Sequence, residues 1–374
     1  MASNLNYRPV IVFAPSVLAG AEKVVITGTE ALFALGLDPH LIVIQETRLP
    51  KLAQNFINEF SPAIKITILE SKKALDFELI SKIKTLLKAE DKQIILHTHG
   101  FKALVTCKLI SLPFLQVHTH HGNTSHTFKV KIYEWLADQA MKRCDHVFAV
   151  SKAMQQQLYK SLSPYKKISV VENMLSFKNS HEIRNYRVDK KIKSENQKIN
   201  FIFIGRLSPE KGLLPFLKNI SRLTIKDKIS LTVLGDGPEM LSAKEYVLTP
   251  EFNCEINFLG FVSNPSDYLK DADILVLPSF TEGLPMTLIE SLCSGIPVIA
   301  NDVGAIKSLL HHNQNGFLTS NNDFSEWEKA IKSCLENLNR WQEFTMDHAQ
   351  ELTENYSAQN WGIKTKFIYE KLIS

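Results

Sequence analysis

The strongest constraint on how this chain folds is a repeated alternation of short apolar runs with helical segments. In the first half, the apolar runs predict strands at residues 9–16, 40–46, 63–69, 94–99, 114–119, 146–151 and 168–172. Helices are expected between most of them, near 20–36, 52–60, 75–88, 130–143 and 152–161. The alternation resumes with strands at 199–204, 230–234, 256–261, 274–278, 297–301 and 316–318. Such alternation predicts an α/β protein with parallel sheets, in which ligand sites lie at the carboxyl ends of the strands.

A polar, charged stretch at residues 176–198 separates the two halves and predicts a linker. The expected domains are therefore 1–175 and 199–355, followed by a terminal helix at 356–374. A chain of 374 residues is also too long for one typical hydrophobic core.

Composition narrows the class of protein. The net charge of +4 is small for this length and gives no case for a nucleic-acid partner. The five cysteines are scattered, which favours reduced thiols in a cytoplasmic protein. The polar start does not read as a signal peptide, and no apolar run approaches the ~20 residues of a membrane span.

The segment 279–290 places two carboxylates around an expected helix start. Glu282 lies in the loop after an apolar strand, and Pro285 suits the first helical position because its missing N–H would be unpaired there. Glu290 then lies ~7 Å further along the helix axis. A helix start attracts phosphate, whereas carboxylates suit hydroxyls, so the combination indicates a nucleotide-sugar. The alternative is two ordinary solvated glutamates.

Arg206 and Lys211 lie in one expected strand-to-helix loop, between Gly205 and Gly212. Arginine can bind phosphate oxygens in a bidentate manner, and lysine adds a point charge. Gly205 would let the backbone approach a ligand closely. Two solvated surface cations are the alternative interpretation.

Three segments taken together, 205–212, 235–238 and 282–290, resemble the signature of the family-four retaining glycosyltransferases (group 1 glycosyl transferases). The resemblance is strongest over 199–318 and continues more weakly at 20–24, 121–122 and 147–151. It implies the GT-B fold, with two Rossmann-like parallel-sheet domains facing a central cleft. It also implies that the N-terminal domain binds the acceptor, the C-terminal domain binds the nucleotide-sugar, and the terminal helix crosses back to the N-terminal domain.

The same resemblance implies a role for each matching residue. Arg206 and Lys211 would bind the donor diphosphate and offset the charge on the leaving group. Glu290 would hold ribose hydroxyls, Glu282 would contact sugar hydroxyls near the reacting carbon, and His121 would contact the sugar or polarise the acceptor. The remaining donor-binding positions are Gly20, Gly205, Gly283, Leu284 and Val262. A simple helix-start glycine explains Gly20 equally well.

Histidines crowd two expected strand ends, at positions 97, 99, 118, 120 and 121. Such a cluster can indicate a metal site. Adjacent strand residues point to opposite faces, however, so these side chains cannot all converge, and we expect no metal. His120 stays a rival for the role given to His121.

Two features fit the family pattern less simply. Asp271 and Asp273 spell the metal-binding motif of the other large glycosyltransferase fold, but they fall between a short helix and a buried strand, where a structural role is expected. The stretch 303–308 lacks the second glycine and the glutamate that the family often has there. That difference leaves the local loop contacts and the donor identity open, but not the class.

Two helices have alternative interpretations. The helix near 130–143 has basic residues on one face and could lie on an anionic membrane, although packing against the sheet is the commoner arrangement. In the terminal helix, Trp361, Ile368 and Leu372 share one face, and Ile363 and Phe367 form a second apolar strip. A wide buried arc is therefore expected.

These features predict a retaining, metal-independent hexosyltransferase that uses a nucleotide-diphosphate sugar, a UDP-sugar in first place, and a glycan or glycolipid hydroxyl as acceptor. No cofactor is expected. The alternatives are a nucleotide-sugar epimerase or phosphorylase on the same fold, or a non-catalytic nucleotide-sugar-binding subunit. By analogy of fold, the expected pathway is cell-envelope polysaccharide or lipopolysaccharide assembly. The expected location is the cytoplasm, with peripheral contact to the inner membrane as a variant.

Overall fold

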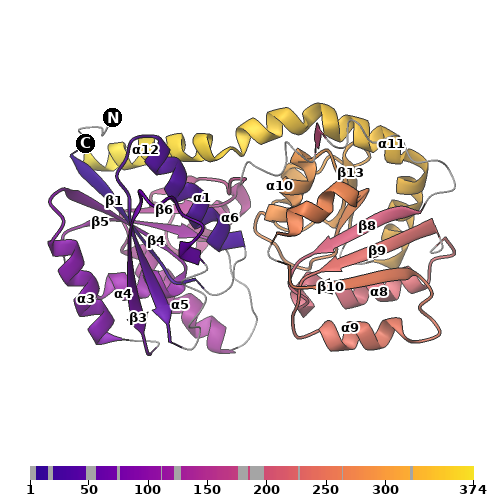
Figure 1. Ribbon diagram of the computed structural model, residues 1–374, viewed down its shortest axis with the longest axis horizontal. Coiled ribbons are helices and arrows are strands. Elements are labelled where there is room, and N and C mark those ends of the chain that lie inside the picture. The colour runs from indigo at the N-terminus through magenta and orange to yellow at the C-terminus, as the bar shows by residue number, and fades with distance from the viewer. Residues whose placement is uncertain are drawn as a thin grey trace. The chain divides into compact units, whose positions relative to one another are not determined.

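The computed structural model describes residues 6–15, 20–47, 56–73, 76–110, 112–121, 128–175, 184–185, 198–225, 228–262, 264–320 and 323–374, with the backbone alone at 20 and 128–134. The chain divides into two compact units. Unit 1 comprises Met1–Ser176 and Tyr356–Ser374, and unit 2 comprises Phe177–Asn355. Each unit is built on one parallel sheet covered by helices (Figure 1).

The sheet of unit 1 has seven parallel strands in the order β3-β2-β1-β4-β5-β6-β7. All seven strands expected in the first half are present, with ends within three residues of the expected ones. They are β1 (Tyr7–Phe13), β2 (His40–Glu46), β3 (Lys65–Ser71), β4 (Gln93–His99), β5 (Leu115–His120), β6 (His146–Ala149) and β7 (Ile168–Val170).

The helices of unit 1 include one that the apolar pattern did not predict. Helix α4 (Phe101–Lys108) follows Gly100, whose φ of 78° ends β4, and with eight residues it is too short to give a clear period. Residues 52–55 of the helix expected near 52–60 lie outside the described residues, and residues 56 and 57 are helical. The other helices are α1 (Gly20–Ala34), α3 (Phe77–Lys88), α5 (Phe128–Lys142), α6 (Lys152–Ser161) and α12 (Ala358–Ile373).

The sheet of unit 2 has six parallel strands in the order β10-β9-β8-β11-β12-β13. They are β8 (Ile199–Ile204), β9 (Ile229–Leu234), β10 (Glu255–Gly260), β11 (Ile274–Leu277), β12 (Val298–Asn301) and β13 (Gly316–Thr319). The helical segments are η1 (Pro209–Lys211), α8 (Leu213–Ser221), α9 (Met240–Val247), η3 (Pro265–Asp271), α10 (Met286–Cys293), η4 (Ile306–Ser308) and α11 (Phe324–Asn355).

One expectation about a helix end in unit 2 is corrected. Helix α10 begins at Met286, and Pro285 is its N-cap with an extended ψ of 128°, rather than its first helical residue. Helix α11 runs from Phe324 to Asn355, and its buried positions recur at helical spacing as far as Thr353.

The terminal helix α12 packs on α1 within unit 1. A Cβ added to Gly28 of α1 would lie 2.8 Å from the Trp361 ring, and one added to Gly362 would lie 2.8 Å from the Leu35 side chain. Small residues therefore allow the two helices to approach closely. The expected wide buried arc is wrong, since Ile363 and Phe367 are exposed and the buried face carries Thr365 and Tyr369 instead.

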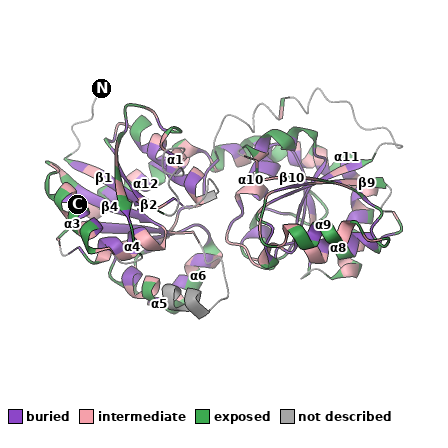
Figure 2. Ribbon diagram, turned by 60° about the horizontal axis from the view of Figure 1, so that its bottom comes forward, coloured by how far each residue is buried: buried purple, intermediate pink, exposed green. Residues whose placement is uncertain are grey.

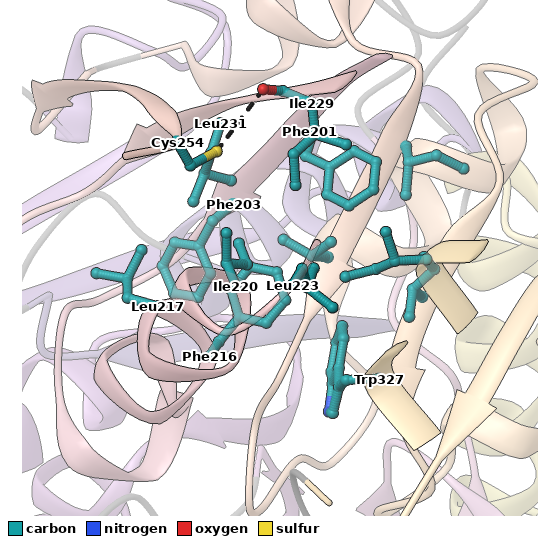
Figure 3. Close-up of a cluster of buried hydrophobic side chains, with 14 of the residues drawn as sticks. Phe201, Phe203, Phe216, Leu217, Ile220, Leu223, Ile229, Leu231, Cys254 and Trp327 are labelled. Carbon is teal, nitrogen blue, oxygen red and sulfur yellow. Dashed lines mark hydrogen bonds between the residues drawn. The ribbon is translucent and has the colours of Figure 1, made fainter. Parts of the chain in front are cut away.

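The core of unit 2 lies between the sheet and helices α8 and α11. Strands are largely buried, whereas helices expose their outer faces (Figure 2). Figure 3 shows the aromatic centre of this core, with Phe201 and Phe203 of β8 facing Phe216 of α8. The Phe216 and Trp327 rings meet edge to face with centroids 4.7 Å apart.

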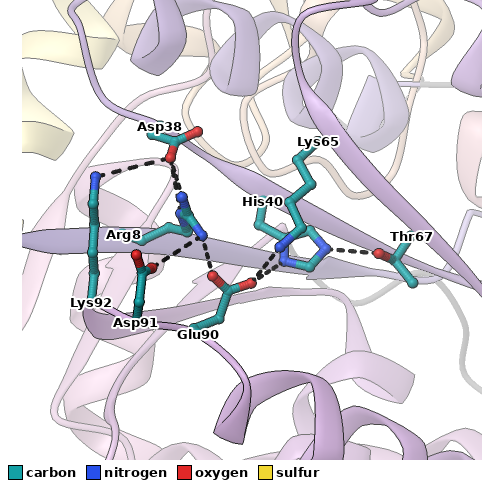
Figure 4. Close-up of polar contacts among 8 residues, drawn as sticks. All are labelled: Arg8, Asp38, His40, Lys65, Thr67, Glu90, Asp91 and Lys92. Carbon is teal, nitrogen blue, oxygen red and sulfur yellow. Dashed lines mark hydrogen bonds and ion pairs between the residues drawn. The ribbon is translucent and has the colours of Figure 1, made fainter. Parts of the chain in front are cut away.

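At the opposite end of the unit 1 sheet from the strand carboxyl ends, a buried carboxylate joins the starts of several strands (Figure 4). Glu90 accepts hydrogen bonds from Arg8 of β1, from His40 Nδ1 of β2 at 2.6 Å and from Lys65 Nζ of β3 at 2.9 Å. The cations keep the pKa of the Glu90 carboxyl at about 2, against the opposing effect of burial. We call these four residues the Glu90 network.

Candidate active site

The carboxyl edge of the unit 2 sheet contains a reversal of strand order. The chain runs from β8 to β9 and β10 on one side, and then returns to β11, which pairs with the other edge of β8. Loops after two such strands diverge and leave a crevice for ligands in sheets of this type. The loop after β8 carries Arg206 and Lys211, and the loop after β11 carries Glu282.

Backbone hydrogen bonds connect the loop after β8 to the loop after β9. Leu207 donates its backbone N–H to the Asp236 carbonyl at 3.0 Å, and its own carbonyl accepts from the Glu239 N–H at 2.9 Å. A Cβ on Gly235, whose φ is 129°, would lie 1.8 Å from the Gly205 carbonyl oxygen. The glycines of the 235–238 motif are thus required for the two loops to touch.

Lys211 and Glu282 form an ion pair in this structure. Lys211 Nζ lies 2.6 Å from Glu282 Oε1, and the same oxygen accepts a hydrogen bond from Ser279 Oγ at 2.7 Å. The Phe280 N–H also donates to the Glu210 carbonyl at 2.8 Å, so backbone and side chains both join the two loops. Among the described residues these contacts go to Oε1, so Oε2 of Glu282 is the atom that can meet a ligand hydroxyl.

The end of β12 and the loop after it also contact the loop after β11. Buried Asn301 donates its side-chain amide to the carbonyls of Pro278 and Ser279 at 3.0 and 3.1 Å. Gly304, with φ of 59°, packs against the Glu282 carbonyl, and the Ala305 N–H donates to the Gly283 carbonyl at 3.0 Å. Ala305 has φ of −97°, so the missing second glycine of the family pattern leaves this backbone contact intact.

Glu290 lies in the second turn of α10 and is mostly buried. Ser266 Oγ of η3 lies 3.4 Å from Glu290 Oε2. The amides of Gly283 and Leu284 precede α10 and donate no hydrogen bond within the described part of the chain. A free amide pair beside a helix start is suited to an anion or a hydroxyl.

The other donor-site residues lie along the same edge. Arg206 is exposed next to Gly205, where its guanidinium can reach solvent-borne phosphate. Val262 follows β10, which β9 separates from β8, so it lies toward the outer end of the edge. Gly20 belongs to unit 1, where it begins α1. The contacts therefore bring Lys211 and Glu282 together, with Arg206 in the same loop after β8 and Glu290 in the helix that follows the β11 loop.

Unit 1 has its own reversal of strand order, between β1 and β4. His97 and His99 end β4, and His121 directly follows β5. His99 Nδ1 lies 3.1 Å from His121 Nε2, whereas His118 and His120 pair with each other on the other side, with ring centroids 6.3 Å apart. His121 and His120 thus belong to different clusters, as strand alternation requires.

Burial keeps these histidines neutral. It lowers the pKa of His97 to about 3 and the pKa of His121 to about 4. Among the described residues, no group of three or more His, Cys, Asp or Glu side chains is placed to hold a metal ion.

Asp271 and Asp273 have structural contacts. Asp271 ends η3, and Asp273 Oδ2 accepts the Asn200 N–H at 2.6 Å at the start of β8. These contacts lie at the amino end of the sheet, away from the crevice, because Asp273 precedes β11.

Helix α5 buries Ala140 and Met141 but exposes Trp135, of which 61% is accessible, and Leu136. Of the helices in the described ranges, none is both long enough and apolar enough to cross a bilayer.

Sequence reasoning missed the residues that hold the charged groups in place. Ser279, Asn301 and Ser266 contact Glu282, its loop and Glu290 respectively. Ser279 could have been suspected from its position three residues before Glu282. Asn301 and Ser266 are distant in sequence and carry no comparable signal.

Two family models match the chain. The model described as "Glycosyltransferase Family 4" matches residues 18–176, and "Glycosyl transferases group 1" matches residues 186–352. A curated relative from Escherichia coli, UDP-Gal:alpha-D-GlcNAc-diphosphoundecaprenol alpha-1,3-galactosyltransferase, is 28% identical over 84% of each chain. The O-antigen chain mannosyltransferase RfbU of Salmonella typhimurium is 26% identical over 74% of this chain and 77% of its own.

Solved structures show the same fold. Anabaena HepE in complex with UDP has a TM-score of 0.78 at 17% identity and covers 97% of this chain and 100% of its own. The lipopolysaccharide outer core galactosyltransferase WaaB in its apo form has a TM-score of 0.71 at 19% identity and covers 96% and 99%.

Proposed function

The chain belongs to the family 4, group 1 glycosyltransferases, with the GT-B fold and retaining chemistry, and we propose that it transfers a hexose from a UDP-sugar to a glycan or glycolipid hydroxyl. The observation that carries the donor site is the meeting of Lys211 and Glu282 at the strand-order reversal of unit 2. The relative from E. coli, whose name states UDP-galactose as donor, supports uracil as the base.

In the proposed donor site, the cationic side chains bind phosphate and the carboxylates bind hydroxyls. Arg206 and Lys211 face the diphosphate, and the amides of Gly283 and Leu284 add hydrogen-bond donors. Glu282 and Glu290 take hydroxyls of the sugar and of the ribose, because carboxylates repel phosphate but accept O–H donors. Lys211 can turn toward phosphate while Ser279 still holds Glu282 Oε1.

In the proposed transfer, the bond between the anomeric carbon and the diphosphate oxygen breaks as the acceptor oxygen bonds to the same carbon on the same face. The acceptor proton passes to the departing phosphate oxygen. Arg206 and Lys211 stabilise the negative charge that develops there, which is usually the largest contribution to such catalysis. His121 contributes from unit 1 by hydrogen-bonding the sugar or the acceptor. Nothing in this step uses a metal or a cofactor.

The acceptor proposal follows the relatives. The names of the E. coli and Salmonella enzymes refer to a diphosphoundecaprenol-linked sugar and to the O-antigen chain. We propose a related cell-envelope acceptor, which would be lipid-linked. Exposed Trp135 and Leu136 of α5 then supply a peripheral contact with the cytoplasmic face of the inner membrane.

The test is a donor panel. UDP-, GDP- and ADP-sugars are compared by thermal shift and by slow hydrolysis to free sugar, with Arg206→Ala and Glu290→Ala as site variants. Lys218→Ala and Glu255→Ala are matched controls, because both residues are exposed in unit 2 and lie outside the crevice. We expect a UDP-sugar to raise the melting temperature of the wild type and both controls but of neither site variant.

Absence of any shift with all three nucleotide classes would refute the donor site. Epimer formation without acceptor, or turnover that requires inorganic phosphate, would refute the transfer reaction while leaving the donor site in place.

A further inference from the structure

We propose that Tyr369 of α12 and His99 of β4 are positioning residues for His121, so that the last helix of the chain takes part in sugar transfer. The inference rests on the proposed role of His121 in the reaction. In this proposal, α12, which belongs to unit 1, fixes the orientation of the His121 ring at the end of β5.

The first step joins α12 to β4. Tyr369 is completely buried, and its hydroxyl lies 2.6 Å from His97 Nδ1. The other ring nitrogen of His97 lies 2.7 Å from Thr119 Oγ1 on β5. Both polar atoms of His97 are therefore engaged, which fixes the plane of its ring.

The second step passes from one ring to the next. The His97 and His99 rings lie with centroids 4.4 Å apart and planes at 36°. Phe148 meets His97 edge-on at 5.2 Å, and Phe13 meets His99 edge-on at 6.5 Å. Enclosed by these aromatic rings, His99 cannot rotate about its Cα–Cβ bond without displacing His97.

The third step reaches His121. His99 Nδ1 lies 3.1 Å from His121 Nε2, and the two rings stack with centroids 5.3 Å apart. One of the two nitrogens donates and the other accepts, so the tautomers of His99 and His121 are coupled. The contact leaves Nδ1 of His121 as the atom that can meet a substrate hydroxyl.

The neutrality of the cluster fits this role. Two of its rings, those of His97 and His121, have pKa values of about 3 and 4, because burial opposes protonation. A neutral ring can hold its hydrogen bonds unchanged across the physiological range, and a fixed ring loses no orientation during the reaction.

The chain offers a matched pair of variants to test the first step. Tyr369→Phe removes the hydroxyl that His97 uses. Tyr7→Phe removes a buried hydroxyl that has no partner among the described residues, on a ring that meets Tyr369 edge-on with centroids 6.5 Å apart. We expect kcat to fall about fivefold to tenfold in Tyr369→Phe and to stay unchanged in Tyr7→Phe. The donor KM and the donor thermal shift should be unchanged in both, because Arg206, Lys211 and Glu290 belong to unit 2.

A second set of variants tests His99. Asparagine can place a polar atom where Nδ1 lies, whereas leucine cannot. We expect His99→Leu to lower kcat by more than tenfold and His99→Asn to restore much of it, again at constant donor KM. The melting temperature of each variant is measured, so that kcat is compared only at temperatures at which all variants are folded.

The outcomes separate this inference from the function on which it rests. Equal kcat in Tyr369→Phe and Tyr7→Phe, or equal loss in His99→Asn and His99→Leu, would overturn the positioning role while His121→Ala still abolishes transfer. Full activity in His121→Ala would overturn the role of His121 and this inference together, and donor binding by unit 2 would stand unaffected.

Discussion

The Glu90 network gives the most direct test of how unit 1 is held together. Glu90→Gln keeps the shape of the side chain but removes its charge, so that His40 and Lys65 lose their ionised acceptor, while Arg8 keeps Asp38. Only 3% of the Glu90 side chain is accessible, and the charged acceptor is therefore hard for water to replace.

The magnitude follows from proton affinity. The pKa of the Glu90 carboxyl is about 2 rather than 4.5, and each tenfold change in proton affinity corresponds to ~1.4 kcal/mol, which gives an upper bound of ~3.5 kcal/mol. Lys65 is 53% exposed, so water screens part of this interaction. We expect Glu90→Gln to lower the free energy of unfolding of unit 1 by ~2 kcal/mol at pH 7.

The sign with pH is fixed by the lowered pKa. A carboxyl with a depressed folded pKa stabilises fully above its unfolded value of 4.5, and that stability disappears as pH falls toward about 2. Burial also lowers the pKa of His40 below 6.5, so protonation of His40 costs stability on the acid side as well. The difference between wild type and Glu90→Gln should therefore shrink steadily below pH 4.5.

The assay is urea unfolding at several pH values between 7 and 3. The control is Glu78→Gln, because Glu78 pairs with Lys82 on the surface of α3 and is 67% exposed. We expect no measurable change from the control. A loss in Glu90→Gln that is the same at pH 7 and pH 3, or no loss at pH 7, would refute the reasoning.

Three further predictions concern the site and the core. Ser279→Ala should lower kcat about tenfold, because a hydrogen bond to a charged carboxylate is lost, whereas Ser294→Ala, which removes a buried hydroxyl without a partner in the described residues, should leave steady-state kinetics unchanged. Gly235→Ala should destabilise unit 2 and abolish the donor thermal shift, because its Cβ would collide with the Gly205 carbonyl. Gly260 also has a positive φ, of 71°, but an added Cβ would meet open space, so Gly260→Ala should cost only ~1–2 kcal/mol in a melting experiment. All five cysteines are buried, and burial raises the pKa of Cys107 and Cys293 to about 12, so mass spectrometry should find them unmodified by iodoacetamide at pH 8 until the protein unfolds.

The strands could be predicted because each is a short apolar run between polar segments, and only their ends were misjudged. Helix α4 was missed because it has only eight residues, too few to show the helical period of its buried Ala103, Leu104 and Cys107. In α12 the buried residues are Trp361, Gly362, Thr365 and Tyr369, while the apolar Ile363 and Phe367 face solvent. The geometry of α1, rather than hydrophobicity, decides which face of α12 is covered.

At the site, motif spacing identified the charged residues but not how they meet. The pairing of Lys211 with Glu282 depends on β8 lying next to β11, and alternation alone does not give strand order. In that arrangement, Asn301 donates a hydrogen bond to the loop backbone, and Ser279 donates one to Glu282. Their roles follow from neighbours in space, which residue types in sequence do not reveal.

The division of the chain has a consequence for synthesis. Unit 1 is discontinuous, since α12 belongs to it although all of unit 2 is translated in between. When residue 176 has been made, the groove at Gly28 and the ring nitrogen of His97 still lack Trp361 and Tyr369. At ~5–20 residues per second, synthesis of the remaining chain takes roughly 10–40 s. Unit 2 is continuous and can finish folding first, so the unit that begins the chain is the last to be completed.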